Sequence, residues 1–162
     1  MQKEYLKNVI NYGKDFKNGE KMFAAGRCVA CHRFGGSGGY SGPDLGSVGN
    51  RYSIRDILVA ICEPSQSISE QYQASTVTLK DGGSIYGRVI YKNDEEIAIA
   101  TNPFNFGEIR KTPMDKVEGV ELSQLSMMPP GTIFAMNQDE LMDLVAYLIS
   151  AGNRKHKVFR QE

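Results

Sequence analysis

Three stretches of the chain carry apolar residues at the three- and four-residue spacing of an α-helix. They lie at about 15–25, 53–63 and 137–152. In the first stretch Phe16, Gly19 and Phe23 share nearly one face, and the missing side chain of Gly19 would let another helix cross closely there. The pattern therefore predicts three amphipathic helices that pack around an apolar core.

The second and third helices also carry signals for where they begin and end. Ser53 with Asp56, and Asn137 with Glu140, have the residue types and the three-residue spacing of a capping box. Pro64 follows the second helix and ends it, because the residue before a proline disfavours helical backbone. These signals predict helices that begin after Ser53 and after Asn137.

Residues from about 72 to 122 follow a different pattern, in which apolar and polar residues alternate with the two-residue period of a β-strand. Ser75–Leu79 alternates, Lys80–Gly83 offers a turn, and the alternation resumes after it, so we predict a hairpin. Shorter alternating pieces follow around 96–99, 108–111 and 117–122. Four or five short strands of this kind suggest a small β-barrel-like module that resembles the Sm or SH3 type.

The order of these elements predicts a mainly α fold with an inserted β module, α+β overall. We expect the helical domain to comprise 15–68 together with 123–153, and the β module to comprise 69–122. The remaining segments, 1–14 and 154–162, are expected to be tails. The sequence leaves open whether the module is a structural cover or a docking surface.

Composition and charge exclude some functions. The chain is 41% hydrophobic and 23% charged, which is the profile of an ordinary globular protein. Its 19 Lys and Arg residues balance 19 Asp and Glu residues and are scattered, so nothing supports a nucleic acid partner. The longest apolar run, Ile57–Cys62, is too short for a membrane span. The first 14 residues lack the apolar stretch of a secretory signal.

Cys28 and Cys31 stand three residues apart, and His32 follows directly. Two thiols about one helical turn apart can each add to one vinyl group of a porphyrin, and the adjacent imidazole can then bind the iron. The Cys-x-x-Cys-His pattern is therefore typical of the covalent attachment of a c-type haem. We expect one such haem.

A thioredoxin-like dithiol and half of a zinc site also use paired cysteines. A dithiol follows a strand, whereas these cysteines follow a predicted helix. A structural zinc ion needs four ligands, and the only other Cys and His residues in the chain are Cys62 and His156. Because Cys62 flanks the apolar face of the second helix, we interpret it as a small buried hydrophobic residue, in preference to a reactive thiol.

A methionine on the second face of the iron would suit an electron carrier, because a thioether favours the reduced metal. Met127 and Met128 lie in a loop that prolines and a glycine keep out of a helix. Neighbouring side chains in an extended segment point in opposite directions, so only one of the two can face the iron. His156 is a rival ligand, but its basic neighbours beyond the last helix favour a solvated tail. The remaining internal methionines occupy ordinary packing positions: Met22, Met114, Met136 and Met142.

Between the cysteines and the second helix lies Gly42-Pro43-Asp44-Leu45. The order of helix, Cys-x-x-Cys-His, Gly-Pro-x-Leu, helix, Met-Pro loop and C-terminal helix resembles a class I c-type cytochrome. In that family the proline carbonyl accepts the Nδ1 proton of the proximal histidine, which here implies a hydrogen bond from His32 to Pro43. Such a bond fixes the ring and makes it a stronger donor to iron.

The combination with a β module resembles one group in particular, the haem-binding cytochrome c domains of planctomycete and verrucomicrobial type, which are often fused to large dehydrogenase-like proteins. The shared motifs include Arg51-Tyr52-Ser53, Pro64-Ser65, Lys80-Asp81-Gly82 and Ser126-Met127-Met128-Pro129. In that group the ligand methionine directly precedes the proline, which implies Met128. The comparison also puts Arg51 and Tyr52 near the haem, where they are candidates for propionate contacts; a capped turn is the other interpretation.

The resemblance implies one-electron transfer through a haem c ligated by His32 and Met128, without catalysis of its own. The expected partner is a dehydrogenase or another cytochrome, and the chain would be the electron-accepting domain where it belongs to a larger oxidoreductase. The alternative is a haem enzyme or haem-based sensor in which the methionine is displaced. Haem attachment in such bacteria occurs outside the cytoplasm, so we expect a periplasmic or otherwise extracytoplasmic location. We expect an export signal or a larger N-terminal protein to precede these residues.

Overall fold

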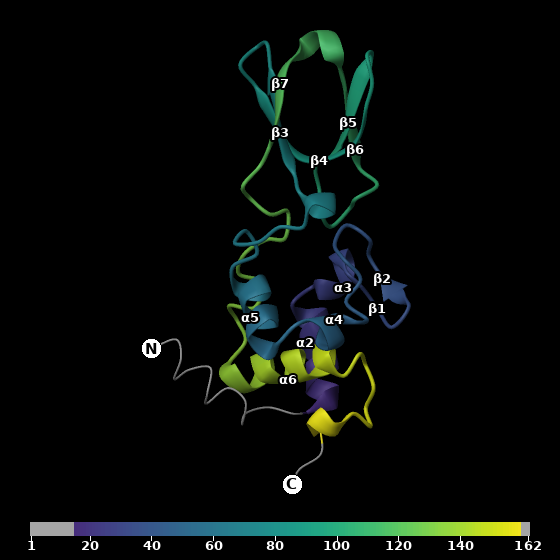
Figure 1. Ribbon diagram of the computed structural model, residues 1–162, viewed down its shortest axis with the longest axis vertical. Coiled ribbons are helices and arrows are strands. Elements are labelled where there is room, and N and C mark those ends of the chain that lie inside the picture. The colour runs from purple at the N-terminus through teal and green to yellow at the C-terminus, as the bar shows by residue number, and fades with distance from the viewer. Residues whose placement is uncertain (1–14, 160–162) are drawn as a thin grey trace. The chain divides into compact units, whose positions relative to one another are not determined.

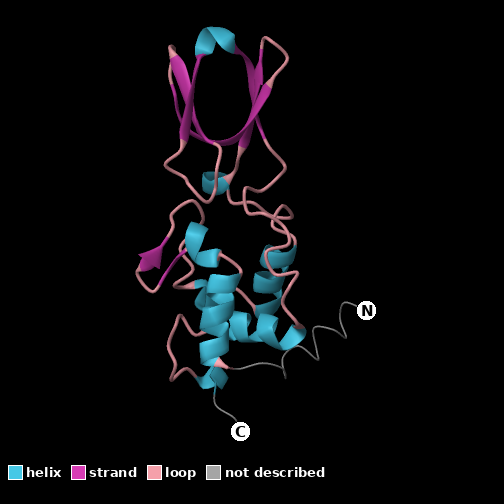
Figure 2. Ribbon diagram, turned by 180° about the vertical axis from the view of Figure 1, so that it is seen from behind, coloured by secondary structure: helices cyan, strands magenta, loops and turns pink. Residues whose placement is uncertain are grey.

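The computed structural model describes residues 15–159 and shows two compact units (Figure 1, Figure 2). Within the described residues, the helical unit comprises 15–63 and 130–159, and the β unit comprises Pro64–Pro129. The predicted tail 1–14 lies outside the described residues, as do the last three residues of the predicted tail 154–162.

The helical unit contains the three predicted helices together with shorter elements. In chain order these are α2 (Phe16–Ala25), α3 (Cys28–Cys31), β1 (Arg33–Phe34), β2 (Ser37–Gly38), α4 (Val48–Arg51), α5 (Ile54–Cys62), α6 (Gln138–Ile149) and the 3-10 helix η3 (Lys157–Phe159). Both predicted capping boxes are present, at the starts of α5 and α6. Helix α4 and the β1–β2 ribbon have too few residues to show a period in the sequence.

Helices α2 and α6 pack closely because Gly19 lies where they meet. A Cβ atom on Gly19 would stand 2.3 Å from the carbonyl oxygen of Asp143, so only glycine allows this approach. The buried carboxylate of Asp143 accepts hydrogen bonds from the backbone N–H of Asp15 (2.7 Å) and the side-chain amide of Asn18 (2.8 Å). The predicted close crossing at Gly19 is therefore confirmed, and it joins α6 to the start of α2.

Aromatic side chains form the centre of this core. Phe23, Phe34 and Tyr147 contact one another with ring centroids 5.0–5.9 Å apart. Phe16 packs edge-on against Tyr147 on one side and against Phe159 on the other. The segment that we predicted to be a C-terminal tail therefore returns to α2 and packs against it through Phe159.

The prediction that Cys62 is buried is wrong. Cys62 is the last residue of α5 and is exposed, whereas Ile57 and Leu58 carry the buried face of the helix. A residue at the border of a helical stripe turns towards the core or towards solvent according to what packs beside it, which the period cannot reveal. Partial desolvation, with the nearby Glu63 carboxylate, raises the pKa of the Cys62 thiol.

The β unit is one antiparallel sheet of five strands with two 3-10 turns. Its elements are η1 (Glu70–Tyr72), β3 (Ser75–Leu79), β4 (Ser84–Lys92), β5 (Glu96–Ala100), β6 (Ile109–Pro113), η2 (Met114–Lys116) and β7 (Val117–Leu122). The strand order is β6-β5-β4-β3-β7, and the predicted hairpin is β3–β4. Its core contains aliphatic side chains from four of the strands: Val77, Ile85, Ile97, Ile99 and Val117.

The sheet is curled but is not closed into a barrel, so the prediction of a barrel is corrected to an open sheet (Figure 1). Irregular register at Thr78/Leu79 and at Val89/Tyr91 bends the strands. Strand β7 pairs with β3, β6 pairs with β5, and the two outer strands do not pair with each other. Alternation in the sequence is the same for an open curled sheet and for a closed barrel, because closure depends on strand tilt and stagger.

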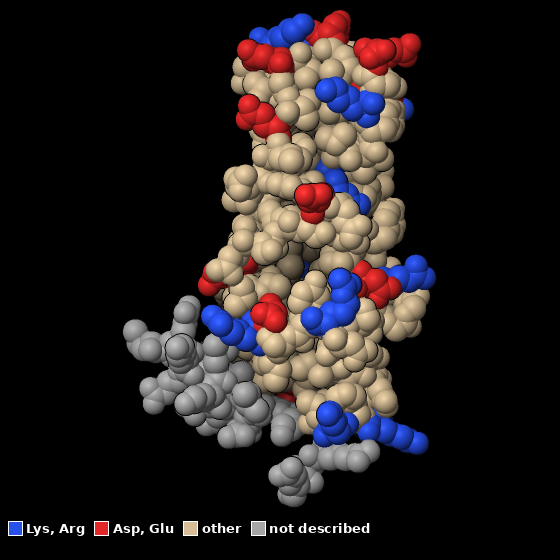
Figure 3. Space-filling view, in the orientation of Figure 1, with Lys and Arg blue, Asp and Glu red and all other residues tan. Residues whose placement is uncertain are grey.

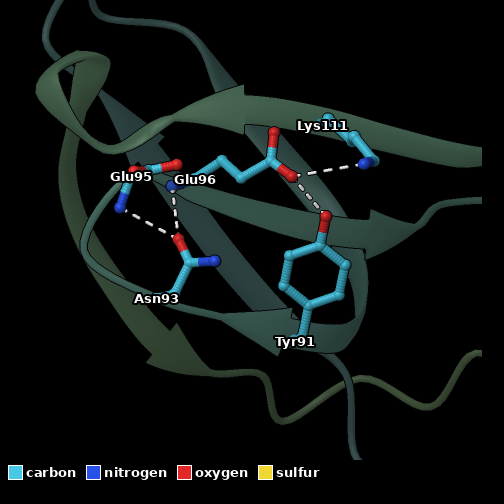
Figure 4. Close-up of polar contacts among 5 residues, drawn as sticks. All are labelled: Tyr91, Asn93, Glu95, Glu96 and Lys111. Atoms are coloured by element: carbon cyan, nitrogen blue, oxygen red, sulfur yellow. Dashed lines mark hydrogen bonds and ion pairs between the residues drawn. The ribbon is translucent and has the colours of Figure 1, made fainter.

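A polar network joins three strands on the surface of the β unit (Figure 4). The Glu96 carboxylate accepts a hydrogen bond from the Tyr91 hydroxyl and pairs with Lys111 Nζ at 3.2 Å. At the β4–β5 turn, Asn93 Oδ1 accepts the backbone N–H groups of Glu95 and Glu96 at 2.9 and 2.8 Å. These contacts fix the turn and the pairing of β4, β5 and β6.

Charged side chains are interspersed on the surface. Figure 3 shows acidic and basic groups of both units without a large area of one sign on the face drawn. Among the described helices, none is both long enough and apolar enough to cross a lipid bilayer.

Candidate functional site

The two paired cysteines lie on one turn of helix. Helix α2 ends at Ala25 with Gly26 as its C-cap, Arg27 adopts a left-handed backbone (φ 57°), and α3 then runs from Cys28 to Cys31. His32 follows in an extended conformation, with its backbone N–H bonded to the Cys28 carbonyl at 2.8 Å. The local fold therefore places two thiols within one helical turn and an imidazole directly after them.

The His32 ring is held by a backbone carbonyl. Its Nδ1 lies 2.8 Å from the carbonyl oxygen of Pro43, which is the hydrogen bond that the family resemblance implied. A carbonyl oxygen can only accept, so Nδ1 carries the proton and Nε2 keeps its lone pair. Burial lowers the pKa of His32, an effect that the bond to Pro43 partly opposes, so the ring is neutral at pH 7. Neutral imidazole with a free Nε2 is the form that binds a metal.

Glycines let the loop after the motif fold tightly against it. A Cβ atom on Gly42 would stand 2.6 Å from Cε1 and 2.8 Å from Nδ1 of His32. A Cβ atom on Gly39 would stand 2.1 Å from the carbonyl oxygen of Ala30. The backbone of this loop therefore lies in contact with the imidazole ring and with α3, at a distance that no other residue type permits.

The Cys28 thiol has the properties of a protonated, partly buried side chain. Burial raises its pKa to about 11, so it is neutral at pH 7. Dithiol redox sites instead stabilise the thiolate. Within residues 15–159, no three His, Cys, Asp or Glu side chains come together as ligands for a metal ion. The dithiol and zinc interpretations therefore have no support in the local environment of Cys28.

Met136 lies beside the first cysteine, which the sequence did not reveal. The Cε of Met136 and the Sγ of Cys28 are 3.2 and 3.3 Å from the point where a Cβ on Gly26 would stand. Both side chains also pack against the core of the helical unit. Met136 precedes a helix cap and belongs to no periodic pattern, so nothing in the sequence connected it with Cys28.

The loop with the other two candidate methionines belongs to the β unit. Met127 and Met128 are both half-buried, and the backbone N–H of Met128 donates to Ser126 Oγ at 3.1 Å. Since His32 belongs to the helical unit, ligation of one iron by His32 and Met128 stays a prediction.

Arg51 and Tyr52 lie at the end of α4 in the helical unit. The Arg51 guanidinium stands 5.5 Å from the centroid of the Tyr52 ring, and both side chains are exposed. Tyr52 also ends the helix, because its backbone N–H bonds to the Val48 carbonyl. An exposed cation beside a phenol hydroxyl is available to a carboxylate, and the predicted contact with haem propionates remains a prediction.

Residues 16–99 match the family model described as Cytochrome c, which is slightly more than half of the chain. The match contains Cys28, Cys31, His32 and Pro43, and it ends before the methionine loop. Among curated proteins no match was found.

Proposed function

Because the chain belongs to the cytochrome c family, we propose that it is a one-electron carrier whose single covalent haem c is held by Cys28 and Cys31 and ligated by His32 and Met128. The observation that supports it best is the geometry of His32, with Nδ1 bonded to Pro43 and with no hydrogen bond to Nε2 from residues 15–159. A histidine held in this way directly after two cysteines on one turn matches what a covalently bound haem requires.

The residues present fit this group. A bound haem would supply an iron that cycles between the ferrous and ferric states, which is a one-electron change. The sulfur atoms of Cys28 and Cys31 would hold the porphyrin through thioether bonds. The hydrogen bond from His32 to Pro43 would keep the imidazole oriented and strengthen it as a donor to the iron. The thioether of Met128 would favour the reduced metal and so raise the potential.

Met128 is preferred over its neighbours for separate reasons. The family resemblance selects Met128 over Met127, since the ligand methionine of that group directly precedes proline. Met136 lies beside Cys28 and is the structural rival. We assign Met136 to the apolar wall of the site, because it packs against the core cluster of the helical unit.

Partner and location follow from the family. Cytochrome c domains are usually extracytoplasmic, and we propose a redox partner there, such as a dehydrogenase of the kind to which the planctomycete-type domains are fused. We also propose that Arg51 and Tyr52 contact the haem propionates, since both are exposed and adjacent in the unit that carries His32.

Three leucine variants test the ligand assignment. In the oxidised holoprotein, Met128→Leu should abolish the charge-transfer band of the methionine–iron bond, whereas Met127→Leu and Met136→Leu should retain it. Loss of the band in Met136→Leu alone would move the ligand to that residue. Acid acetone should leave the haem on the protein, and rapid binding of carbon monoxide by the parent protein would instead indicate an enzyme or a sensor.

A further inference from the structure

Two serines to which the proposed function gives no role, Ser65 and Ser126, meet in the structure. Ser65 lies just after the start of the β unit, and Ser126 lies near its end. The backbone N–H of Ser126 donates to Ser65 Oγ at 3.0 Å, across 61 residues of sequence. This hydrogen bond joins the segment that enters the β unit to the segment that leaves it.

The segment from 123 to 128 is bonded to the β unit at its beginning. The backbone N–H of Ser123 donates to the Ala74 carbonyl (2.9 Å), and its carbonyl accepts from Gln73 Nε2 (3.2 Å). The hydroxyl of Ser123 accepts the backbone N–H of Leu125 at 3.0 Å. Ser123 is itself buried, so these bonds are shielded from water.

The same segment is held further along by side chains. The Tyr86 hydroxyl, on β4, donates to the Leu125 carbonyl at 2.9 Å. Partial burial raises the pKa of Tyr86, so this donor keeps its proton at neutral pH. Beyond it, Ser126 bonds to Ser65 through its backbone and accepts the N–H of Met128 through its hydroxyl. The β unit therefore holds this segment up to the residue that we propose as a ligand.

We propose that the β unit is a brace for the axial methionine, and that Ser65 and Ser126 are positioning residues for Met128. This inference rests on the proposed function, in which Met128 is the ligand. A loop that is already ordered loses less conformational entropy when its side chain binds, so the bound state is favoured. The Ser65 hydroxyl binds the backbone N–H of Ser126, and the Ser126 hydroxyl binds the backbone N–H of Met128. The two serines therefore fix the backbone from which the Met128 side chain projects.

Competition with free imidazole measures this effect in the haem-loaded protein. Imidazole binds the iron only when the methionine has left, so its apparent affinity rises with the fraction of open loop. We expect Ser65→Ala and Ser126→Ala each to bind imidazole about two- to tenfold more tightly than the parent, which is what one ordinary hydrogen bond is worth. The variant that binds imidazole more tightly should also show the weaker charge-transfer band of the methionine–iron bond.

Matched variants separate positioning from a general loss of stability. Ser65→Thr and Ser126→Thr keep the accepting oxygen and should stay within about twofold of the parent. Ser67 is exposed and its hydroxyl makes no hydrogen bond among the described residues, so Ser67→Ala should leave the affinity unchanged. Urea unfolding of each variant shows whether the haem-loaded protein is still folded under the conditions of the imidazole titration.

The outcomes distinguish the two proposals. If the parent lacks the methionine band, or Met128→Leu retains it, the ligand assignment fails and the brace fails with it. If the parent has the band and both alanine variants bind imidazole as Ser67→Ala does, Met128 remains the ligand and only the positioning role is refuted. Tighter binding in the alanine variants, restored by threonine, supports the brace.

Discussion

Replacing Gly19 by alanine would test the close packing of α2 and α6. A Cβ atom at this position would stand 2.3 Å from the carbonyl oxygen of Asp143 and 2.7 Å from the Cβ of Tyr147. Real Cβ atoms essentially never come within 3.0 Å of another atom, and both of these neighbours belong to rigid parts of α6. The two helices must therefore move apart to accept the alanine.

The size of the effect follows from three contributions. Overpacking a helix contact costs about 1–3 kcal/mol, and the backbone clash places Gly19→Ala at the upper end of this range. Separation of the helices also weakens the hydrogen bonds from Asp15 and Asn18 to Asp143, at about 1 kcal/mol each. Alanine returns about 1 kcal/mol through its higher helix propensity. We expect a net loss of about 3–4 kcal/mol in the free energy of unfolding of the helical unit.

Urea unfolding followed by haem absorbance measures this loss, because the attachment cysteines belong to the same unit as α2 and α6. The midpoint should fall by about 1–2 M for a typical urea slope. Gly119 has open space around its Cα, so Gly119→Ala serves as a control and should change stability by less than about 0.5 kcal/mol. If Gly19→Ala unfolds at or above the midpoint of the parent, the reasoning from the close crossing is refuted.

Three other substitutions have defined outcomes. Gly42→Ala should displace the His32 ring from Pro43, lower the yield of haem-loaded protein and shift the reduction potential of the protein that still forms. Redox titration measures the shift, and an unchanged potential would show that the ring tolerates the added Cβ. Asp143→Ala should cost about 2–3 kcal/mol in urea unfolding, because two donors on α2 lose their buried acceptor. The hydrogen bonds from Ser53 lower the pKa of Asp56 in the folded protein below its ordinary value of 3.8. The ionised Asp56 carboxylate therefore stabilises the fold fully above pH 3.8, and this stabilisation is lost as the pH falls through the lower pKa of the folded state. Between about pH 6 and about pH 3 the parent should therefore lose more stability than Asp56→Asn, and equal losses would contradict the capping box.

Local signals explain what the sequence predicted well. The helices α2, α5 and α6 begin where Asp15, Ser53 and Asn137 cap them, and each cap acts on residues within one turn. The motif of Cys28 to His32 is likewise local, because its geometry needs only one turn of helix. Such features depend on neighbours in sequence, so their outcome can be predicted from sequence.

Features that depend on distant parts of the chain were missed. The exposure of Cys62 and the position of Met136 beside Cys28 are set by tertiary packing, on which the helical period carries no information. The open sheet shows the same limit, since alternation within each strand is indifferent to whether β6 and β7 pair. The role of Ser65 could not be inferred either, because its partner Ser126 is 61 residues away.

The bond between Ser65 and Ser126 also bears on how such a chain could have arisen. The two ends of the β unit are joined by a hydrogen bond, so the distance that it spans between the segments before and after it is as short as that spanned by a tight turn. The entropy of closing a loop grows only slowly with its length, so the host gains a long segment at little thermodynamic cost. The part of the β unit between Ser65 and Ser126 is thus a segment that evolution, or an engineer, can exchange for another of different length while Met128 is kept.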